Sequence, residues 1–294
     1  LELRQRRGGG PFLTLVLADN TGRISALVWE NVGELDDVLQ PGEVVQVQGS
    51  VQRYNQRLQV VIRGAKTVES DEVDESLFVR TARVDAGELW DQLLALIESV
   101  KDEHLKQLLF RVFSDSEVNE LFKTAPAAQV MHHAYRVGLL EHTISVATSG
   151  AHLAEHYGLD RDLVVAGTLL HDLGKLWELE GSTSVSYTDE GRLLGHLTIG
   201  VCFVERVLAD LPQFPAETRL QLLHILLAHH GEYEYGSPRR PKTPEALLVH
   251  MADLLDSKMA GMMEAINADG DTEAAWSPFS KILGRFIYRR RYGR

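Results

Sequence analysis

The sequence predicts two domains, a small N-terminal β-barrel and a larger all-α domain. Between residues 12 and 68 the apolar residues often alternate with polar ones, which is the period of a β-strand. From residue 85 onward they recur at steps of three and four, which is the period of a helix. Residues 69–75, an acidic stretch without apolar period, separate the two patterns. We therefore expect a barrel over residues 1–70, a linker over 71–84, a helical domain over 85–280 and a basic tail over 281–294.

The barrel prediction depends on short strands and on the turns between them. Turn residues gather at 18–22, 41–42 and 54–56, a spacing typical of a small antiparallel barrel or sandwich of about five strands. A polar, helix-prone insert covers residues 31–39. The residues expected to share a face within each strand are Phe12, Thr14 and Val16, then Ile24, Ala26 and Val28, then Val45 and Val47, then Leu58, Val60 and Ile62.

This order of strands and insert resembles the OB fold, whose curved face and loops hold single-stranded nucleic acid. The resemblance implies contacts to nucleic acid by basic and aromatic residues of the barrel, namely Arg23, Trp29, Arg53, Tyr54, Arg57 and Arg63. The alternative is that Trp29 belongs to the core and the arginines to an ordinary surface. The first strand begins almost at residue 1. A barrel that lacks its opening residues would expose a sheet edge, so we also expect an N-terminal piece of the barrel to be missing.

Apolar runs and chain breakers define the helical domain. Runs with helical spacing cover residues 89–100, 105–113, 163–170 and 220–227. Proline and glycine divide this part of the chain into about eight to ten helices. The breakers are Pro126, Gly158, Gly181, Pro212 and Pro215.

Histidines and aspartates within or at the ends of these helices are candidate metal ligands. In chain order they are His142, the pair His171-Asp172, His196, the pair His229-His230, and Asp253. Eleven of the 12 histidines lie between residues 132 and 250. An unpaired imidazole or carboxylate in an apolar helix is destabilising, and a shared divalent ion would remove that cost. The alternative is that each histidine is a separately hydrogen-bonded core residue.

Composition limits the class of protein. The single Cys202 excludes a disulfide framework and favours the reducing cytoplasm, and no apolar run is long enough to span a membrane. A net charge of −12 repels polyanions, so nucleic acid would have to bind at local basic surfaces. Residues 281–294 are such a surface, with six Lys/Arg, no acid and three aromatic residues; the alternative is a solvated tail.

The ordered ligands resemble the HD superfamily of metal-dependent phosphohydrolases. His171-Asp172-Leu173-Gly174-Lys175 matches its HDxGK signature, with His142 upstream and Asp253 downstream. The resemblance implies one ion held by His142, His171, Asp172 and Asp253. Asp172 would bridge to a second ion held by His196 and by His229, His230 or both. The mixed donors suit Mn²⁺, our first expectation, and also Fe²⁺, Co²⁺, Ni²⁺ or Zn²⁺.

The resemblance also implies roles for residues beside these ligands. Lys175 would neutralise the scissile phosphate, although a helix C-terminal lysine complementing the dipole is the alternative. His133 and Arg136, shortly before His142, could bind phosphate or protonate the leaving group, although a capping or core role is equally open.

The chain is similar to the YhaM-type 3′→5′ exoribonucleases. The resemblance rests on the order of an OB-like barrel before an HD domain and on residues 139–143, 195–196 and 229–238. One departure is Val137, where that family's Tyr-Arg-Gly-Gly segment has its first glycine. The resemblance implies exonucleolytic hydrolysis of single-stranded RNA, or of DNA. The alternatives are a nucleotide or nucleoside-triphosphate phosphohydrolase, and a non-catalytic nucleic-acid-binding protein with a structural metal. Tyr235-Gly236-Ser237-Pro238 argues against the cyclic-dinucleotide phosphodiesterases, which carry Gly-Tyr-Pro after their histidine pair.

Overall fold

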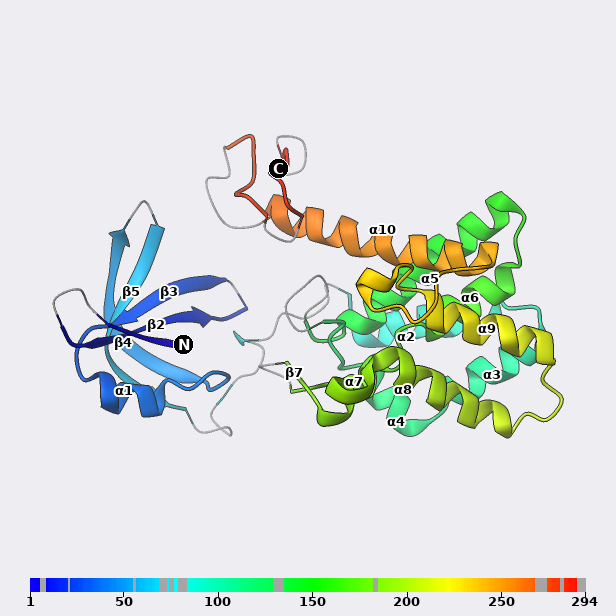
Figure 1. The fold of residues 1–294 in the computed structure, drawn as a ribbon, viewed down its shortest axis with the longest axis horizontal. Helices are drawn as coiled ribbons and strands as arrows, with labels where there is room; N and C mark the ends of the chain where they lie inside the picture. The colour runs from blue at the N-terminus through cyan, green and yellow to red at the C-terminus, as the bar shows by residue number, and fades with distance from the viewer. Residues whose placement is uncertain are drawn as a thin grey trace. The chain divides into compact units, whose positions relative to one another are not determined.

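The computed structural model describes residues 1–5, 9–20, 22–54, 57–68, 73, 77–78, 84–128, 135–181, 185–267, 274–280 and 283–289. The chain divides into two compact units between Arg80 and Thr81 (Figure 1). The first is a sheet with one short helix and the second is helical. Among the described helices, none is both long and apolar enough to cross a membrane.

The first unit is a twisted five-stranded sheet in the order β1-β2-β3-β5-β4. The strands are β1 (Glu2–Gln5), β2 (Pro11–Ala18), β3 (Arg23–Val28), β4 (Val45–Tyr54) and β5 (Arg57–Thr67), with α1 (Val32–Val38) between β3 and β4. Three neighbouring pairs are antiparallel, but β3 and β5 are parallel. The expectation of a wholly antiparallel barrel is therefore wrong at this pair. Because α1 and β4 come between them in the chain, β5 returns beside β3 in the same direction.

The core of this unit lies under α1, and it corrects one predicted strand face. Leu13 is fully buried, and Leu15 and Leu17 pack against the core, whereas Val16 is exposed. The predicted face of Phe12, Thr14 and Val16 is thus the outer one. The segment 11–18 is apolar on both faces, so alternation alone does not decide which side is buried. The predicted face of Ile24, Ala26 and Val28 does point inward, with Ala26 and Val28 buried.

The second unit packs its helices around one apolar core. In chain order they are α2 (Ala86–Glu98), α3 (Glu103–Phe113), α4 (Ser116–Phe122), α5 (Gly138–Tyr157), α6 (Arg161–Leu170), α7 (Lys175–Glu178), α8 (Asp189–Ala209), α9 (Ala216–Ala228) and α10 (Pro244–Asn267). Four of them begin with an aspartate whose carboxylate accepts a backbone N–H of the first turn. Helices α5, α6 and α10 pack against one another, as Figure 1 shows, and position most of the candidate ligands.

Short strand pairs complete this unit. β6 (Leu179–Glu180) pairs with β7 (Ser186–Tyr187), and isolated bridges join Trp276 to Tyr288 and Ser280 to Arg285. Strands of two residues are too short to produce an alternating pattern, so the sequence did not predict them.

Candidate metal centre

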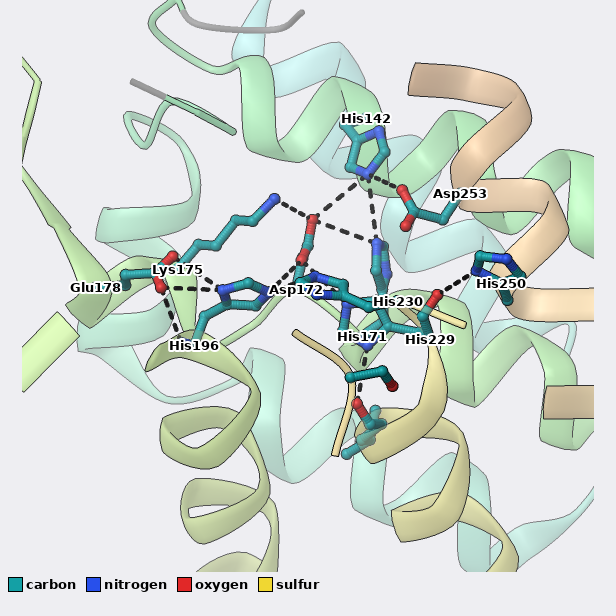
Figure 2. Close-up of polar contacts among 12 residues, drawn as sticks. His142, His171, Asp172, Lys175, Glu178, His196, His229, His230, His250 and Asp253 are labelled. Atoms are coloured by element: carbon teal, nitrogen blue, oxygen red, sulfur yellow. Dashed lines mark hydrogen bonds and ion pairs between the residues drawn. The ribbon is translucent and has the colours of Figure 1, made fainter. Parts of the chain in front are cut away.

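The candidate ligands converge from five segments of the helical unit (Figure 2). His142 lies in the second turn of α5, and His171 and Asp172 follow the last residue of α6. His196 follows a kink in α8 at Gly195, which has φ 71°. The pair His229-His230 follows α9, and Asp253 lies inside α10. Side chains separated by up to 111 positions in the chain thus meet at one centre.

Two glycines allow these segments to approach closely. A Cβ on Gly174 would lie 2.0 Å from the carbonyl oxygen of His196, so the turn after Asp172 packs directly on the backbone of α8. Gly231 has φ 81°, and a Cβ there would lie 2.3 Å from the imidazole of His250. Nδ1 of the same imidazole donates a hydrogen bond to the carbonyl oxygen of His229, at 2.7 Å. These contacts fix the turn after α6 and the turn after α9.

The first subset comprises His142, His171 and Asp253, together with Oδ2 of Asp172. His142 Nε2 lies 3.3 Å from His171 Nε2 and 3.3 Å from Asp253 Oδ1. Asp172 Oδ2 lies 3.5 Å from His142 Nε2 and 3.3 Å from His171 Nε2. His142, His171 and Asp172 offer ligand atoms that all lie within 4.8 Å of one another, and Asp253 lies next to this group through its contact with His142.

The second subset comprises His196, His229 and His230, gathered near Oδ1 of Asp172. Oδ1 lies 3.5 Å from His196 Nε2 and 3.6 Å from His229 Nε2. His196 Nε2 lies 3.1 Å from His230 Nε2. The three histidines offer ligand atoms that all lie within 4.8 Å of one another. The structure brings both members of the pair His229-His230 to this subset, and Asp172 presents one oxygen to each subset.

Backbone carbonyls orient three of the imidazoles. Nδ1 of His171 lies 2.7 Å from the carbonyl oxygen of Thr168, Nδ1 of His229 lies 2.9 Å from that of Leu226, and Nδ1 of His230 lies 2.8 Å from that of Tyr235. A carbonyl oxygen only accepts hydrogen bonds, so each Nδ1 donates. In the neutral rings Nε2 then carries the lone pair, and every one of these lone pairs points into the centre.

Carboxylates orient the other two imidazoles, one in each subset. Nδ1 of His142 lies 2.7 Å from Asp256 Oδ2, and Asp256 also accepts the hydroxyl of Ser145. Nδ1 of His196 lies 3.0 Å from Glu178, whose carboxylate also accepts the backbone N–H of His196 at 3.0 Å. Carboxylate partners of this kind fix ring orientation and raise the basicity of a metal-binding histidine.

A divalent cation fits this arrangement. When each of these rings is neutral with its proton on Nδ1, the Nε2 atoms of His142 and His171 face each other as lone pairs, as do those of His196 and His230, and a cation would stabilise each pair. His229 Nε2 is buried and has no hydrogen-bond partner among the described residues, a condition that is destabilising unless an ion binds it. Imidazole nitrogens with carboxylate oxygens are donors that suit divalent transition metals.

Electrostatics in the protein without metal follow from the same contacts. Burial opposes the charge on Asp172, but the Lys175 ammonium and neighbouring imidazoles outweigh it and hold the pKa of this carboxyl well below its usual value. Burial also opposes the charge on His142, but three carboxylates outweigh it and raise the pKa of this imidazole. Burial lowers the pKa of His229 to about 4, so its ring is neutral and available as a ligand at neutral pH.

Of the predicted catalytic residues other than Asp172, Lys175 contacts the candidate centre. The ammonium of Lys175 lies 2.7 Å from Asp172 Oδ2, at the edge of the first subset. Arg136 is exposed, two residues before α5 begins at Gly138. His133 lies outside the described residues. The helix of His142 begins only at Gly138, because Val137 has φ 69°, a left-handed conformation that a helix does not continue through.

Of the predicted nucleic-acid contacts in the barrel, some lie together at one turn and others lie on separate strands. Arg53 and Tyr54 end β4 at the turn into β5, and both are exposed. Arg57 begins β5, although its side chain lies outside the described part of the chain. Arg23 and Arg63 are exposed on β3 and β5, whereas Trp29 is half-buried and stacks on Phe12, with ring centroids 4.8 Å apart.

Sequence reasoning did not identify how the imidazoles are oriented. It gives no specific partner to Glu178 or Asp256, and the carbonyls of Thr168 and Leu226 are invisible in a sequence because every residue has one. A usable signal did exist for the carbonyls. A histidine directly after a helix can donate to the carbonyl three residues earlier, since the last carbonyls of a helix lack partners within it.

Comparisons with known proteins agree with the division into a barrel and a helical domain. Residues 2–68 match the family model described as an OB-fold nucleic acid binding domain, and residues 139–258 match the HD domain. The predicted fold class, an OB-like barrel followed by an all-α HD domain, is confirmed. The paired ligand subsets and the fold thus define an HD-domain protein that carries an OB fold.

Curated relatives identify the family within that class. The chain is 37% identical to the 3′-5′ exoribonuclease YhaM of Bacillus subtilis over 260 residues, covering 88% of this chain and 82% of the relative. The YhaM of a Geobacillus species is 36% identical, over 85% of this chain and 77% of the relative. The chain belongs to the YhaM family. A solved structure, the HD domain of the Listeria monocytogenes phosphodiesterase PgpH, is 17% identical with a TM-score of 0.34 over 54% of this chain, and it adds nothing to that assignment.

Proposed function

We propose that the protein is a metal-dependent 3′→5′ exonuclease that acts on single-stranded RNA. The observation that carries the proposal is the placement of Asp172, which directs one carboxylate oxygen to each of two subsets of donor atoms. Two subsets joined by one carboxylate suit a pair of ions acting on a single phosphodiester. The 3′→5′ polarity and the RNA substrate come from the names of the curated relatives.

Each residue of the centre has a part in this reaction. When bound, divalent ions would activate water for in-line attack on phosphorus and stabilise charge on the leaving oxygen. His142, His171, Asp172 and Asp253 would hold one ion, and Asp172, His196, His229 and His230 the other. Glu178 and Asp256 keep His196 and His142 in the tautomer that binds metal. Lys175 stabilises the negative charge of Asp172 and, at the edge of the centre, adds positive charge facing the phosphate.

The remaining assignments have separate support. The OB-fold match supports a nucleic-acid-binding role for residues 1–70, with Arg23, Trp29, Arg53, Tyr54, Arg57 and Arg63 as contacts, and the charge of residues 281–294 supports a second basic surface. We propose the catalytic domain over 85–280, with 71–84 as linker, and phosphate contacts by His133 and Arg136. Mn²⁺ is the ion we propose first. The single cysteine keeps the cytoplasm as the proposed location.

A time course on a 5′-labelled single-stranded RNA oligomer tests the function. With Mn²⁺ we expect the labelled product to shorten from the 3′ end and mononucleotides to appear, while free nucleoside triphosphates remain intact. A DNA oligomer in parallel measures the preference for RNA. Hydrolysis of triphosphates without shortening would favour the nucleotide phosphohydrolase. Binding without cleavage across Mn²⁺, Fe²⁺, Co²⁺, Ni²⁺ and Zn²⁺ would favour the non-catalytic protein.

A further inference from the structure

The turn that follows His230 has a fixed shape that the proposed chemistry does not explain. It contains the short helix η3 (Tyr233–Tyr235) and closes at Ser237, whose backbone N–H donates to the carbonyl of Glu232 at 3.2 Å. The buried hydroxyl of Ser237 lies 2.6 Å from the carbonyl oxygen of Arg239 and 3.1 Å from that of Leu227, at the end of α9. The turn is therefore anchored to the same helix that carries the histidine pair.

This turn is tied directly to a candidate ligand. The carbonyl oxygen of Tyr235 holds Nδ1 of His230 at 2.8 Å, so the backbone of Tyr235 lies one imidazole ring away from the donor atom of the second subset. Both tyrosine side chains nevertheless face solvent, with Tyr233 56% and Tyr235 64% exposed. The guanidinium of Arg240 lies 5.1 Å from the Tyr233 ring and also pairs with Glu232 at 2.7 Å. A cation and two exposed aromatic rings thus belong to the turn whose backbone holds His230.

A second exposed apolar pair lies on α8, just before the ligand His196 of the second subset. Leu193 and Leu194 are 83% and 52% exposed, and they directly precede the kink at Gly195 and the ligand His196. His196 Nε2 and His230 Nε2 lie only 3.1 Å apart. Single exposed apolar residues are ordinary, but here two pairs flank two ligands that touch each other.

We propose that the turn Tyr233–Tyr235 is a stacking surface for the nucleobases at the 3′ end of the RNA. This inference rests on the proposed function, since it assumes that the scissile phosphate lies at the metal centre. The turn is hydrogen-bonded to the candidate ligand His230, and the substrate is the molecule that has to reach that ligand. Stacking on an aromatic ring tolerates every base, which an exonuclease that removes successive nucleotides requires. A turn held in one shape loses little conformational entropy when a base binds.

Removing one ring and one base in turn tests the proposal. The variants are Tyr235→Ala and Tyr235→Phe, and the matched control is Tyr157→Ala. Tyr157 is 67% exposed at the far end of α5, 15 residues from His142, which is about 22 Å along a helix. The substrates are two RNA oligomers that differ only in their 3′-terminal residue, which is an ordinary nucleotide in one and an abasic residue in the other. Cleavage rates, binding of each oligomer and bound Mn²⁺ are measured for every variant.

We expect Tyr235→Ala to lower kcat/KM and to weaken binding about tenfold on the ordinary oligomer, and to change little on the abasic one. Tyr235→Phe keeps an aromatic face and should retain wild-type behaviour, as should Tyr157→Ala. Bound Mn²⁺ should stay unchanged, because only the carbonyl of Tyr235 supports His230.

Two results would overturn the stacking surface: no change in Tyr235→Ala, or an equal loss on both oligomers, which would show that Tyr235 acts through His230. Failure of the proposed function has a different signature. In that case the wild-type protein cleaves neither oligomer, while binding still reveals whether Tyr235→Ala discriminates between them.

Discussion

The two subsets of the candidate centre are built in different ways. The first subset draws His142 and Asp253 from within α5 and α10, two helices that pack against each other. The second draws His196 from a helix kink and His229 and His230 from a helix end. The first subset thus combines two residues inside helices with His171 at the end of α6, whereas all three histidines of the second lie at a kink or a helix end, next to Gly195 and Gly231.

This difference has a functional consequence. Tyr233, Tyr235, Leu193 and Leu194 are exposed and lie within five residues of His230 or His196 in the chain. Helix α10 also exposes Met251 and Leu255 beside Asp253. Because the turns beside the second subset expose aromatic rings, we expect that subset to lie on the side where substrate enters.

The largest effect should come from the residue that the two subsets share. Asp172→Asn keeps the size of the side chain but removes the charge that two ions would share, so we expect kcat to fall by at least about 10³-fold. Metal analysis should show loss of both ions, and circular dichroism should show an intact fold. The control is Asp91→Asn, a substitution at an exposed position of α2. Retained cleavage by Asp172→Asn would contradict the assignment of the centre.

Removing a ligand from one subset should separate the two. His230→Ala takes one imidazole from the second subset, whose Nε2 lies 3.1 Å from that of His196, and leaves the first subset intact. We expect about one ion to be lost per chain and activity to fall about 10²-fold. Asp253→Asn should instead weaken the ion of the first subset. If His230→Ala binds both ions as tightly as the wild type, then Asp172, His196 and His229 hold the second ion without His230.

The candidate ligands could be identified in the sequence, because each is a polar residue within or beside an apolar run. His171-Asp172 after an apolar run, and Asp253 flanked by leucines, reveal themselves by this contrast. The division into subsets was expected from the resemblance to the HD superfamily, but the spacing of the residues alone could not provide it. It depends on which Asp172 oxygen faces which helix, and that follows from the packing of α8 on Gly174. The buried face of β2 was also beyond reach, since Leu15 and Val16 are equally apolar neighbours on opposite faces.

An intermediate effect should come from the two carboxylates that orient imidazoles. Glu178→Gln weakens the support of His196, and Asp256→Asn that of His142. Losing such a partner typically lowers metal affinity about 10- to 100-fold. We expect Glu178→Gln to weaken only the second ion and Asp256→Asn only the first, as measured by titrating metal into the stripped protein. The same loss of both ions in either variant would show that the subsets do not bind independently.

The smallest effect on activity should come from Val137, directly before α5. Its φ of 69° disfavours a β-branched residue by about 1–2 kcal/mol, yet its side chain is buried and packs in the core. In Val137→Gly the relief of strain offsets part of the lost burial, so the free energy of unfolding should change by less than about 1 kcal/mol. The control is Val146→Gly, inside the same helix and fully buried, where lost burial and helix propensity add to about 3 kcal/mol. Equal destabilisation of both variants in urea titrations would show that Val137 is not strained, and that the glycine of the family's pattern is needed for some reason other than backbone conformation.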